Sequence, residues 1–296
     1  MFEGLDILTL TDRFRTDEDC KSYLADIKWK GGFTCRHCGH TAWFRTKDPY
    51  VRRCSNCKKK DSVTAGTMFH KCKFSLRKAF ILAFEMSCSK KSISSHEFAR
   101  RYTMRQKTVW HFMQKVRKAM ESSQQYPLEG NVEADEFMVG GPEKGKRGRS
   151  HGEKKLAVIA INHDEYGIHQ CYARVIANSG TKELKPFFED HVDPTAEIRT
   201  DKWRGYTPIA QHYPNLRQEK SNGGKNFQFI HRQIMMFKGW LRGVHHHCSH
   251  LQGYLNEFCY RFNRLKHPKS LFHNLIARMV KRSQMTQLEV NLSWDL

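Results

Sequence analysis

The feature that most constrains this chain is a set of four cysteines in its first sixty residues. They form two Cys-x2-Cys pairs, Cys35 with Cys38 and Cys54 with Cys57, and fifteen residues separate the pairs. Two pairs at this spacing indicate a tetrahedral zinc site built on two tight turns, as in a zinc ribbon. Redox pairs and disulfides are the alternatives, but no helix-forming run follows either pair. We expect structural Zn²⁺ in a ribbon over residues 31–70.

The positive charge of the chain is the second constraint, because it points to a polyanionic partner. The 296 residues include 51 Lys and Arg against 30 Asp and Glu, a formal net charge of +21. Residues 71–118 alone hold thirteen Lys and Arg and two acids, a net charge of +11. A solvated basic surface is the alternative. Nucleic acid fits this density better, since each neutralised phosphate releases counterions.

The hydropathy of the chain does not suggest a membrane protein. The longest apolar runs are short, such as residues 156–161, and none approaches the ~20 residues that span a bilayer. The N-terminal residues are acidic and lack the pattern of a secretory leader. We expect a soluble, intracellular protein with no membrane partner, and its length predicts two or three folded units.

The segment that carries most of the charge has a helical pattern. Ser94 and Glu97 form a capping-box start for one helix, and Thr103 with Met104 breaks it. Apolar residues at helical spacing then mark the core-facing side of the next helix. These residues are Val109, Met113, Val116 and Met120.

A short helix, a turn and a basic amphipathic helix together predict a helix-turn-helix over residues 71–126. An ordinary three-helix packing unit with a solvated basic face is the alternative. The side chains of this segment that we expect to contact DNA are Arg105, Lys107 and Lys115.

The pattern changes near Pro127, after which strands and helices alternate. This order is typical of an α/β domain with a mixed sheet. Residues 143–155, between the first two strands, are rich in Gly, Lys and Arg and predict a long basic hairpin loop; a second loop is expected at 214–228. The expected strands are 131–139, 156–161, 170–177 and 196–200, and the expected helices are 181–191, 203–213, 229–241 and 249–264.

Acids at strand positions form a candidate catalytic group. Alternation places Glu133 and Asp135 on one face of the first strand, and Asp201 follows the fourth. An acid within a buried strand is unfavourable unless it is paired or binds a metal. If the two strands are neighbours, the carboxylates of Asp135 and Asp201 converge, as in sites that hold Mg²⁺ or Mn²⁺. A helix cap or an exposed strand end is the alternative for each acid.

Four stretches of sequence carry a broader likeness. They are Val-Glu-Ala-Asp-Glu-Phe-Met-Val-Gly-Gly at 132–141, the apolar strand 156–161, Thr-Asp-Lys-Trp-Arg-Gly-Tyr at 200–206 and the segment 237–264. Together with the ribbon and the basic loop, they resemble the zinc-ribbon insertion-sequence transposases of bacteria, over about residues 15–265. That family belongs to the DDE recombinases. The resemblance therefore implies a zinc ribbon and a helix-turn-helix followed by an RNase H-like catalytic domain with a mixed sheet.

The resemblance also implies roles for single residues. Asp135 and Asp201 become the first two catalytic acids, and Lys238 contacts phosphate near the scissile bond. The family normally has Glu seven residues before this Lys, and here that residue is His231. Seven residues are about two helical turns, so His231 and Lys238 share a helix face.

A histidine at the third catalytic position leaves several interpretations open. Its imidazole can bind a divalent metal, Mn²⁺ better than Mg²⁺, or act as a general base. Alternatively, His231 is only a surface residue of an inactive element, or Glu257 or Glu219 supplies the third acid. For the ligand-like histidines nearby we favour DNA-facing or loop-packing roles; these are His245, His246, His247 and His250.

The expected function is DNA transposition by a DDE-type, two-metal-ion enzyme. In this hypothesis the ribbon and the helix-turn-helix bind double-stranded DNA at terminal inverted repeats. Asp135, Asp201 and His231 hold two Mg²⁺ or Mn²⁺ ions for hydrolysis at the transposon end and for attack of the freed 3′-OH on target DNA. A catalytically inactive DNA-binding regulator and an RNase H-like nuclease are the alternatives. Further DNA contacts are expected from Lys144, Lys146, Arg147, Arg149 and Arg204.

We expect the chain to have five parts and to act as an oligomer. Because two DNA ends must be cut together, we expect a homodimer or a larger synaptic assembly, in the bacterial cytoplasm at the nucleoid. The parts are a helical lead-in at 1–30, the ribbon at 31–70, the helix-turn-helix domain at 71–126, the catalytic domain at 127–266 and a basic C-terminal tail at 267–296.

Overall fold

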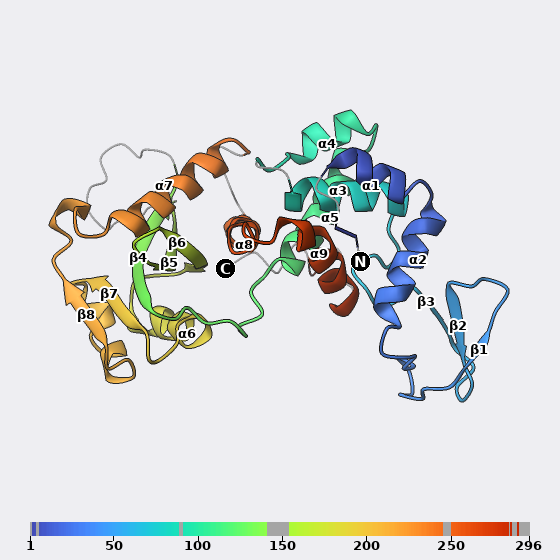
Figure 1. Cartoon of the computed structure of the whole chain (residues 1–296), viewed down its shortest axis with the longest axis horizontal. Coiled ribbons are helices and arrows are strands. Elements are labelled where there is room, and N and C mark those ends of the chain that lie inside the picture. The colour runs from blue at the N-terminus through green and yellow to red at the C-terminus, as the bar shows by residue number, and fades with distance from the viewer. Residues whose placement is uncertain are drawn as a thin grey trace. The chain divides into compact units, whose positions relative to one another are not determined.

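The computed structural model describes residues 2–3, 6–88, 91–140, 154–244, 250–283, 285 and 289. The chain forms two compact units (Figure 1). The N-terminal unit combines residues 1–120 with 267–291, and the sheet unit spans 121–266. Within the described ranges, no helix is long and apolar enough to cross a bilayer.

The zinc ribbon is a three-stranded antiparallel sheet in the N-terminal unit. Its strands, in the order β1-β2-β3, are β1 (Trp43–Arg45), β2 (Val51–Cys54) and β3 (Lys60–Ser62). The guanidinium of Arg52 lies 3.9 Å from the ring centre of Trp29 and 4.2 Å from that of Trp43. Because Trp29 ends α2 (Asp17–Lys28), these cation–π contacts tie the ribbon to the helix before it.

Helices form the rest of the N-terminal unit. The Ser94 side chain accepts a hydrogen bond from the Glu97 N–H at 3.1 Å, which is the serine half of the predicted capping box. The Glu97 side chain binds Arg100 and Arg101. Thr103, in the turn between α4 and α5, has a left-handed φ of 49°, which ends α4 sharply. The predicted apolar stripe of α5 is buried. Besides α2, the helices within residues 1–120 are α1 (Ile7–Arg13), α3 (Leu76–Cys88), α4 (Ser95–Arg101) and α5 (Gln106–Ala119).

The segment that we expected to be a basic tail contributes to the N-terminal unit. After a short 3-10 turn (Pro268–Ser270), α9 (Leu271–Lys281) packs against α2, α3 and α5. Phe272 is fully buried, with its ring centre 5.4 Å from that of Phe2 and 5.6 Å from that of Phe80. The segment is therefore amphipathic as well as basic, and its apolar face completes a core.

The sheet unit contains a five-stranded mixed sheet in the order β6-β5-β4-β7-β8. The strands β4, β5 and β6 pair in antiparallel fashion, and β7 and β8 run parallel to β4. This arrangement confirms the mixed α/β fold that the sequence predicts. The strands are β4 (Asn131–Val139), β5 (Lys155–His163), β6 (Ile168–Ile176), β7 (Glu197–Asp201) and β8 (Leu216–Glu219).

Helices cover both faces of this sheet (Figure 1). On one face, α6 (Thr181–His191) packs on a core that includes Val132 and Ala134. On the other face, α7 (Gln228–Arg242) and α8 (Leu251–Phe262) pack on a core that includes Phe137. Because side chains alternate along β4, its odd-numbered acids lie on the α7 side.

Two segments differ from the sequence-based expectations. The predicted loop after residue 213 contains β8, a short polar edge strand, and a 3-10 turn (Asn222–Gly224). The predicted helix 203–213 consists instead of two 3-10 turns, Arg204–Tyr206 and Ile209–Gln211, with Pro208 between them. Proline lacks an N–H and disfavours a helical residue before it, so Pro208 favours a break here. Proline does not exclude a helix outright, since α6 continues through Pro186.

Candidate active site and zinc site

The four cysteines of the ribbon form a metal site. Their Sγ atoms all lie within 4.8 Å of one another, with 3.5 Å between Cys35 and Cys57 and 3.6 Å between Cys38 and Cys54. Zinc–sulfur bonds of about 2.3 Å in a tetrahedron place sulfurs a little under 4 Å apart, so the cluster fits Zn²⁺. The His40 backbone N–H, with help from the neighbouring thiols, lowers the pKa of Cys38 to about 6. The predicted structural zinc site is confirmed.

Asp135 and Asp201 lie at the same end of two neighbouring parallel strands. Pairing of β4 with β7 runs as far as Ala134 opposite Thr200, and the two aspartates are the next residues along. The Oδ1 atom of Asp135 accepts a hydrogen bond from the Glu136 N–H at 2.8 Å. The two strands are therefore neighbours, as the expected convergence of these carboxylates requires.

The carboxyl group of Asp135 is electrostatically unusual. Its side chain is 24% exposed. Burial raises the pKa of Asp135 to about 6, the charge of Asp201 adds to this shift, and the Glu136 N–H and His231 oppose it. A carboxylate that is costly to ionise beside a second carboxylate is stabilised by a cation.

His231 is the residue that α7 brings to Asp135. Its Nε2 atom lies 3.5 Å from Oδ2 of Asp135. The imidazole also lies against Gly224, where an added Cβ would be only 2.3 Å from the ring. Gly224 has a φ of +86°, so both its backbone conformation and its lack of a side chain make room for the histidine.

Glu133 anchors the start of α7, a role that the sequence did not reveal. Its side chain is 1% exposed, and Oε2 accepts a hydrogen bond from the Ile230 N–H at 3.1 Å. A carboxylate at a helix N-terminus satisfies a free donor and favours the helix dipole. Because His231 is the next residue, this contact between β4 and α7 sets where the imidazole lies.

Arg199 extends this anchor across the sheet. Its Nη1 donates to Glu133 Oε1 at 3.3 Å, its Nη2 donates to the Asn226 carbonyl at 3.1 Å, and it binds Glu219 through two nitrogens. One guanidinium thus connects β4, β7, β8 and the loop that leads into α7. Glu219 is committed to this ion pair, which argues against its serving as the third catalytic acid.

Glu257, the other candidate for the third acid, lies on α8, and Lys238, the candidate for phosphate contact, lies on α7. Glu257 is fully buried on α8, 3.9 Å from Arg261, within the core beneath α7 and α8. Lys238 is half-buried on α7, where burial lowers its pKa and the Asp135 charge opposes the shift. Lys238 therefore lies within electrostatic reach of Asp135.

The aspartates and His231 do not yet form a closed ligand set. Over the described residues, only the ribbon cysteines bring three or more ligand atoms within 4.8 Å of one another. The Asp201 carboxylate accepts a hydrogen bond from the Trp203 N–H at 3.0 Å, which holds it in a local turn. Some movement within this group would be needed to bring three ligand atoms around one ion.

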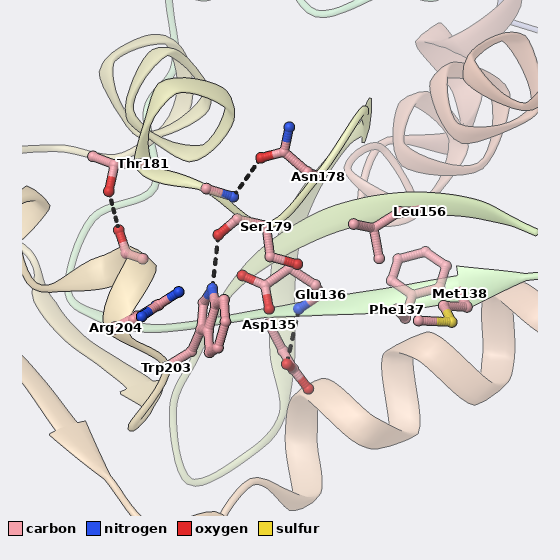
Figure 2. Close-up of a pocket in the computed structure, with 12 residues that line it drawn as sticks. Asp135, Glu136, Phe137, Met138, Leu156, Asn178, Ser179, Thr181, Trp203 and Arg204 are labelled. Atoms are coloured by element: carbon pink, nitrogen blue, oxygen red, sulfur yellow. Dashed lines mark hydrogen bonds between the residues drawn. The ribbon is translucent and has the colours of Figure 1, made fainter. Parts of the chain in front are cut away.

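A pocket of about 640 Å³ opens beside Asp135 (Figure 2). Asp135 and Glu136 line it together with the indole of Trp203 and the guanidinium of Arg204. The Trp203 Nε1–H donates to the Ser179 carbonyl at 2.7 Å, which fixes the indole against the start of α6. The pocket thus offers an apolar and aromatic wall next to the acidic group.

The residues expected to contact DNA are only partly described. Arg105 and Lys107 are exposed at the start of α5. Lys115 is half-buried, and burial lowers its pKa, so its side chain is less accessible than the other two. Arg204 is exposed. Outside the described residues lie Lys144, Lys146, Arg147, Arg149, His245, His246 and His247.

Two parts of the chain match known protein families. Residues 127–263 match the ISXO2-like transposase domain, and residues 15–60 match the transposase zinc-ribbon domain. The chain belongs to the zinc-ribbon DDE transposase family. In this transposase, the two matched regions contain the cysteine cluster and the Asp135–His231 site.

Solved structures similar to this transposase are distant. The crystal structure of a pre-cleavage Mos1 transpososome is 9% identical, with 66% of this chain and 76% of that chain covered and a TM-score of 0.28. The Mos1 mariner paired end complex with Mn is 10% identical, with coverages of 65% and 76% and a TM-score of 0.17. At these TM-scores, neither likeness supports a conclusion about this transposase. No curated protein matches the chain significantly.

Proposed function

We propose that this chain is the transposase of an insertion sequence, which cleaves the 3′ ends of its element and joins them to target DNA. The observation that carries the proposal is the placement of Asp135 beside Asp201 on neighbouring strands, with His231 Nε2 at 3.5 Å from Asp135. Two carboxylates and an imidazole are a donor set suited to Mg²⁺ or Mn²⁺.

The roles of the site residues follow from their chemistry. Asp135 and Asp201 would hold divalent ions, and His231 would complete the ligand set or accept the proton of the attacking water or 3′-OH. When bound, such ions supply Lewis-acid activation at phosphorus and stabilise the leaving oxygen. Lys238 would neutralise a phosphate oxygen, and Arg204 would neutralise phosphate at the mouth of the pocket.

DNA recognition in this proposal belongs to the N-terminal unit. Arg105 and Lys107 are exposed at the start of α5, where a helix-turn-helix presents its recognition helix to the major groove. The net charge of +21 supports binding of both transposon ends and target DNA. Joint cleavage of two ends calls for a homodimer or a larger assembly.

The test is strand transfer with purified wild-type, Asp135→Asn and Asp201→Asn proteins, in Mn²⁺ and in Mg²⁺. We expect both variants to keep their DNA affinity and to lose at least about 100-fold in cleavage and joining, because each removes a metal-binding charge. The matched control is Glu197→Gln, which neutralises an exposed acid at the start of β7 and should leave activity unchanged.

Three outcomes would redirect the proposal. Full activity in both variants would remove the metal-site assignment. Cleavage without joining in the wild-type protein would indicate a nuclease. Because His231 replaces the family's usual Glu, the element could also be inactive. Specific DNA binding with neither reaction in either metal would indicate an inactive regulator.

A further inference from the structure

The outer face of the zinc ribbon carries an exposed aromatic ring within a row of cations. Phe44 lies opposite Arg53 in the pairing of β1 with β2, and Arg53 lies opposite Lys60 in the pairing of β2 with β3. Residues directly opposite each other in an antiparallel sheet point to the same face. Phe44, Arg53 and Lys60 therefore form one row across all three strands.

This row is accessible and has no acidic member. Phe44 is 53% exposed, and Arg53 and Lys60 are also exposed. The Nζ atom of Lys58, a further exposed cation, lies 5.1 Å from the centre of the Phe44 ring. The ring is thus surrounded by positive charge on its own face of the sheet.

The opposite face of the ribbon accounts for the stability of the sheet. Trp43 and Arg52 point to that face, where Arg52 contacts the Trp29 ring at 3.9 Å. The acid of that face, Asp61, is buried and pairs with Lys28 at 3.1 Å. The contacts that join the sheet to α2 therefore lie on the face away from Phe44, and Asp61 is paired there instead of facing the outer row.

An exposed ring flanked by cations has a specific binding chemistry. Proteins that hold single-stranded DNA combine aromatic rings, on which bases stack, with cations that follow the phosphates. Duplex DNA keeps its base faces stacked inside the helix, so a ring on a flat sheet can reach a base face only where nucleotides are unpaired. Phe44 lies on β1, an edge strand of the ribbon, so no further strand of this sheet lies beyond it.

We infer that the outer face of the ribbon binds single-stranded DNA, with an unpaired base stacked on Phe44 and the adjoining phosphates bound by Arg53, Lys58 and Lys60. The inference rests on the proposed function for the source of such nucleotides, which is the unpaired DNA at a cleaved transposon end. It revises the expectation that the ribbon binds duplex repeats together with the helix-turn-helix, and leaves duplex recognition to α5.

The experiment measures the binding of zinc-loaded, full-length protein to a labelled oligothymidylate of about 15 nucleotides and to a duplex of equal length. We expect Phe44→Ala to weaken oligothymidylate binding about ten-fold with little effect on the duplex, since base stacking is lost. Phe44→Trp should retain the affinity. The matched control is Tyr166→Ala, which removes an 88% exposed ring from the sheet unit and should change neither affinity.

Substitution of the cations tests the phosphate contacts separately. The plot of log affinity against log salt has a negative slope. Arg53→Gln and Lys60→Gln should each make this slope less negative by about 0.7 for the oligothymidylate, because each removes one phosphate contact. Equal losses in Phe44→Ala and Tyr166→Ala, equal losses for single strand and duplex, or unchanged affinity in Phe44→Ala would each overturn the inference.

The inference and the proposed function can fail independently. Asp135→Asn should bind oligothymidylate as the wild type does while losing strand transfer. If the wild-type protein shows no strand transfer but its single-strand binding still depends on Phe44, the transposase proposal is refuted and the ribbon site is supported. Strand transfer by a protein whose single-strand binding does not depend on Phe44 would support the transposase proposal and refute the ribbon site.

Discussion

Replacement of Asp135 by Asn is expected to stabilise the folded sheet unit at pH 8, although it should abolish catalysis. Burial and the Asp201 charge raise the pKa of Asp135 from its ordinary 3.8 to about 6. Because the folded-state pKa is the higher one, this group favours folding fully only below about pH 4. Its contribution is lost as the pH rises through about 6.

The size of the effect follows from the shift. From 3.8 to about 6 is roughly two pKa units, so ionisation of Asp135 costs the folded state up to about 3 kcal/mol at pH 8 and about half of that at pH 5. The Asn side chain keeps an oxygen that can accept the Glu136 N–H, so removal of the charge is the main change. Asp135→Asn should therefore raise the free energy of unfolding most at pH 8.

Hydrogen–deuterium exchange of the β4 amides measures this free energy within the sheet unit, without added Mg²⁺ or Mn²⁺ and with the ribbon zinc retained. Glu197→Gln, which neutralises an exposed acid on β7, is the control and should show no pH-dependent gain. A variant at Asp135 that is no more stable than wild type at pH 8, or equally stabilised at pH 5 and pH 8, would refute the reasoning.

Three further changes test the arrangement around α7. His231→Glu should move the metal preference of strand transfer from Mn²⁺ toward Mg²⁺, because a carboxylate replaces an imidazole; an unchanged preference would exclude His231 as a ligand. Gly224→Ala should lower strand transfer by about ten-fold or more, since its Cβ would meet the His231 ring, whereas Gly223→Ala, with φ of +66° and no atom within 4 Å of its added Cβ, controls for backbone strain. Comparable activity in the two glycine variants would contradict the packing argument. Glu133→Gln should lower the free energy of unfolding by about 1–3 kcal/mol in urea titrations, since the Ile230 N–H loses a charged acceptor, and an unchanged value would remove its anchoring role.

The parts of the site that the sequence predicted have strictly local signals. The spacing of the ribbon cysteines is sufficient to predict the metal cluster, because a tetrahedral S4 site needs little more than two turns brought together. The strand position of Asp135 and the strand-end position of Asp201 could also be predicted. Their adjacency could not be predicted from the residue pattern alone and was implied only by the family resemblance, because the pairing of β4 with β7 depends on the crossover through α6.

The missed features depend on contacts between distant segments. Glu133 shares a face with Asp135 by simple alternation, but its bond to the Ile230 N–H joins residues 97 apart in the chain. The strand β8 carries only one apolar residue, Leu216, so its sequence has no alternating pattern. The basic helix α5 has Arg117 buried at 1% exposure, which shows that a positive charge on a predicted helix need not face solvent or DNA.

The return of α9 to the N-terminal unit affects how the protein can mature during its synthesis. The core around Phe272 cannot close until residue 281 has left the ribosome, by which time the whole sheet unit has also been made. Nascent or prematurely terminated chains would then carry an incomplete N-terminal unit. Under the proposed function, a chain with a complete N-terminal unit would therefore always carry the sheet unit with Asp135 and Asp201 as well.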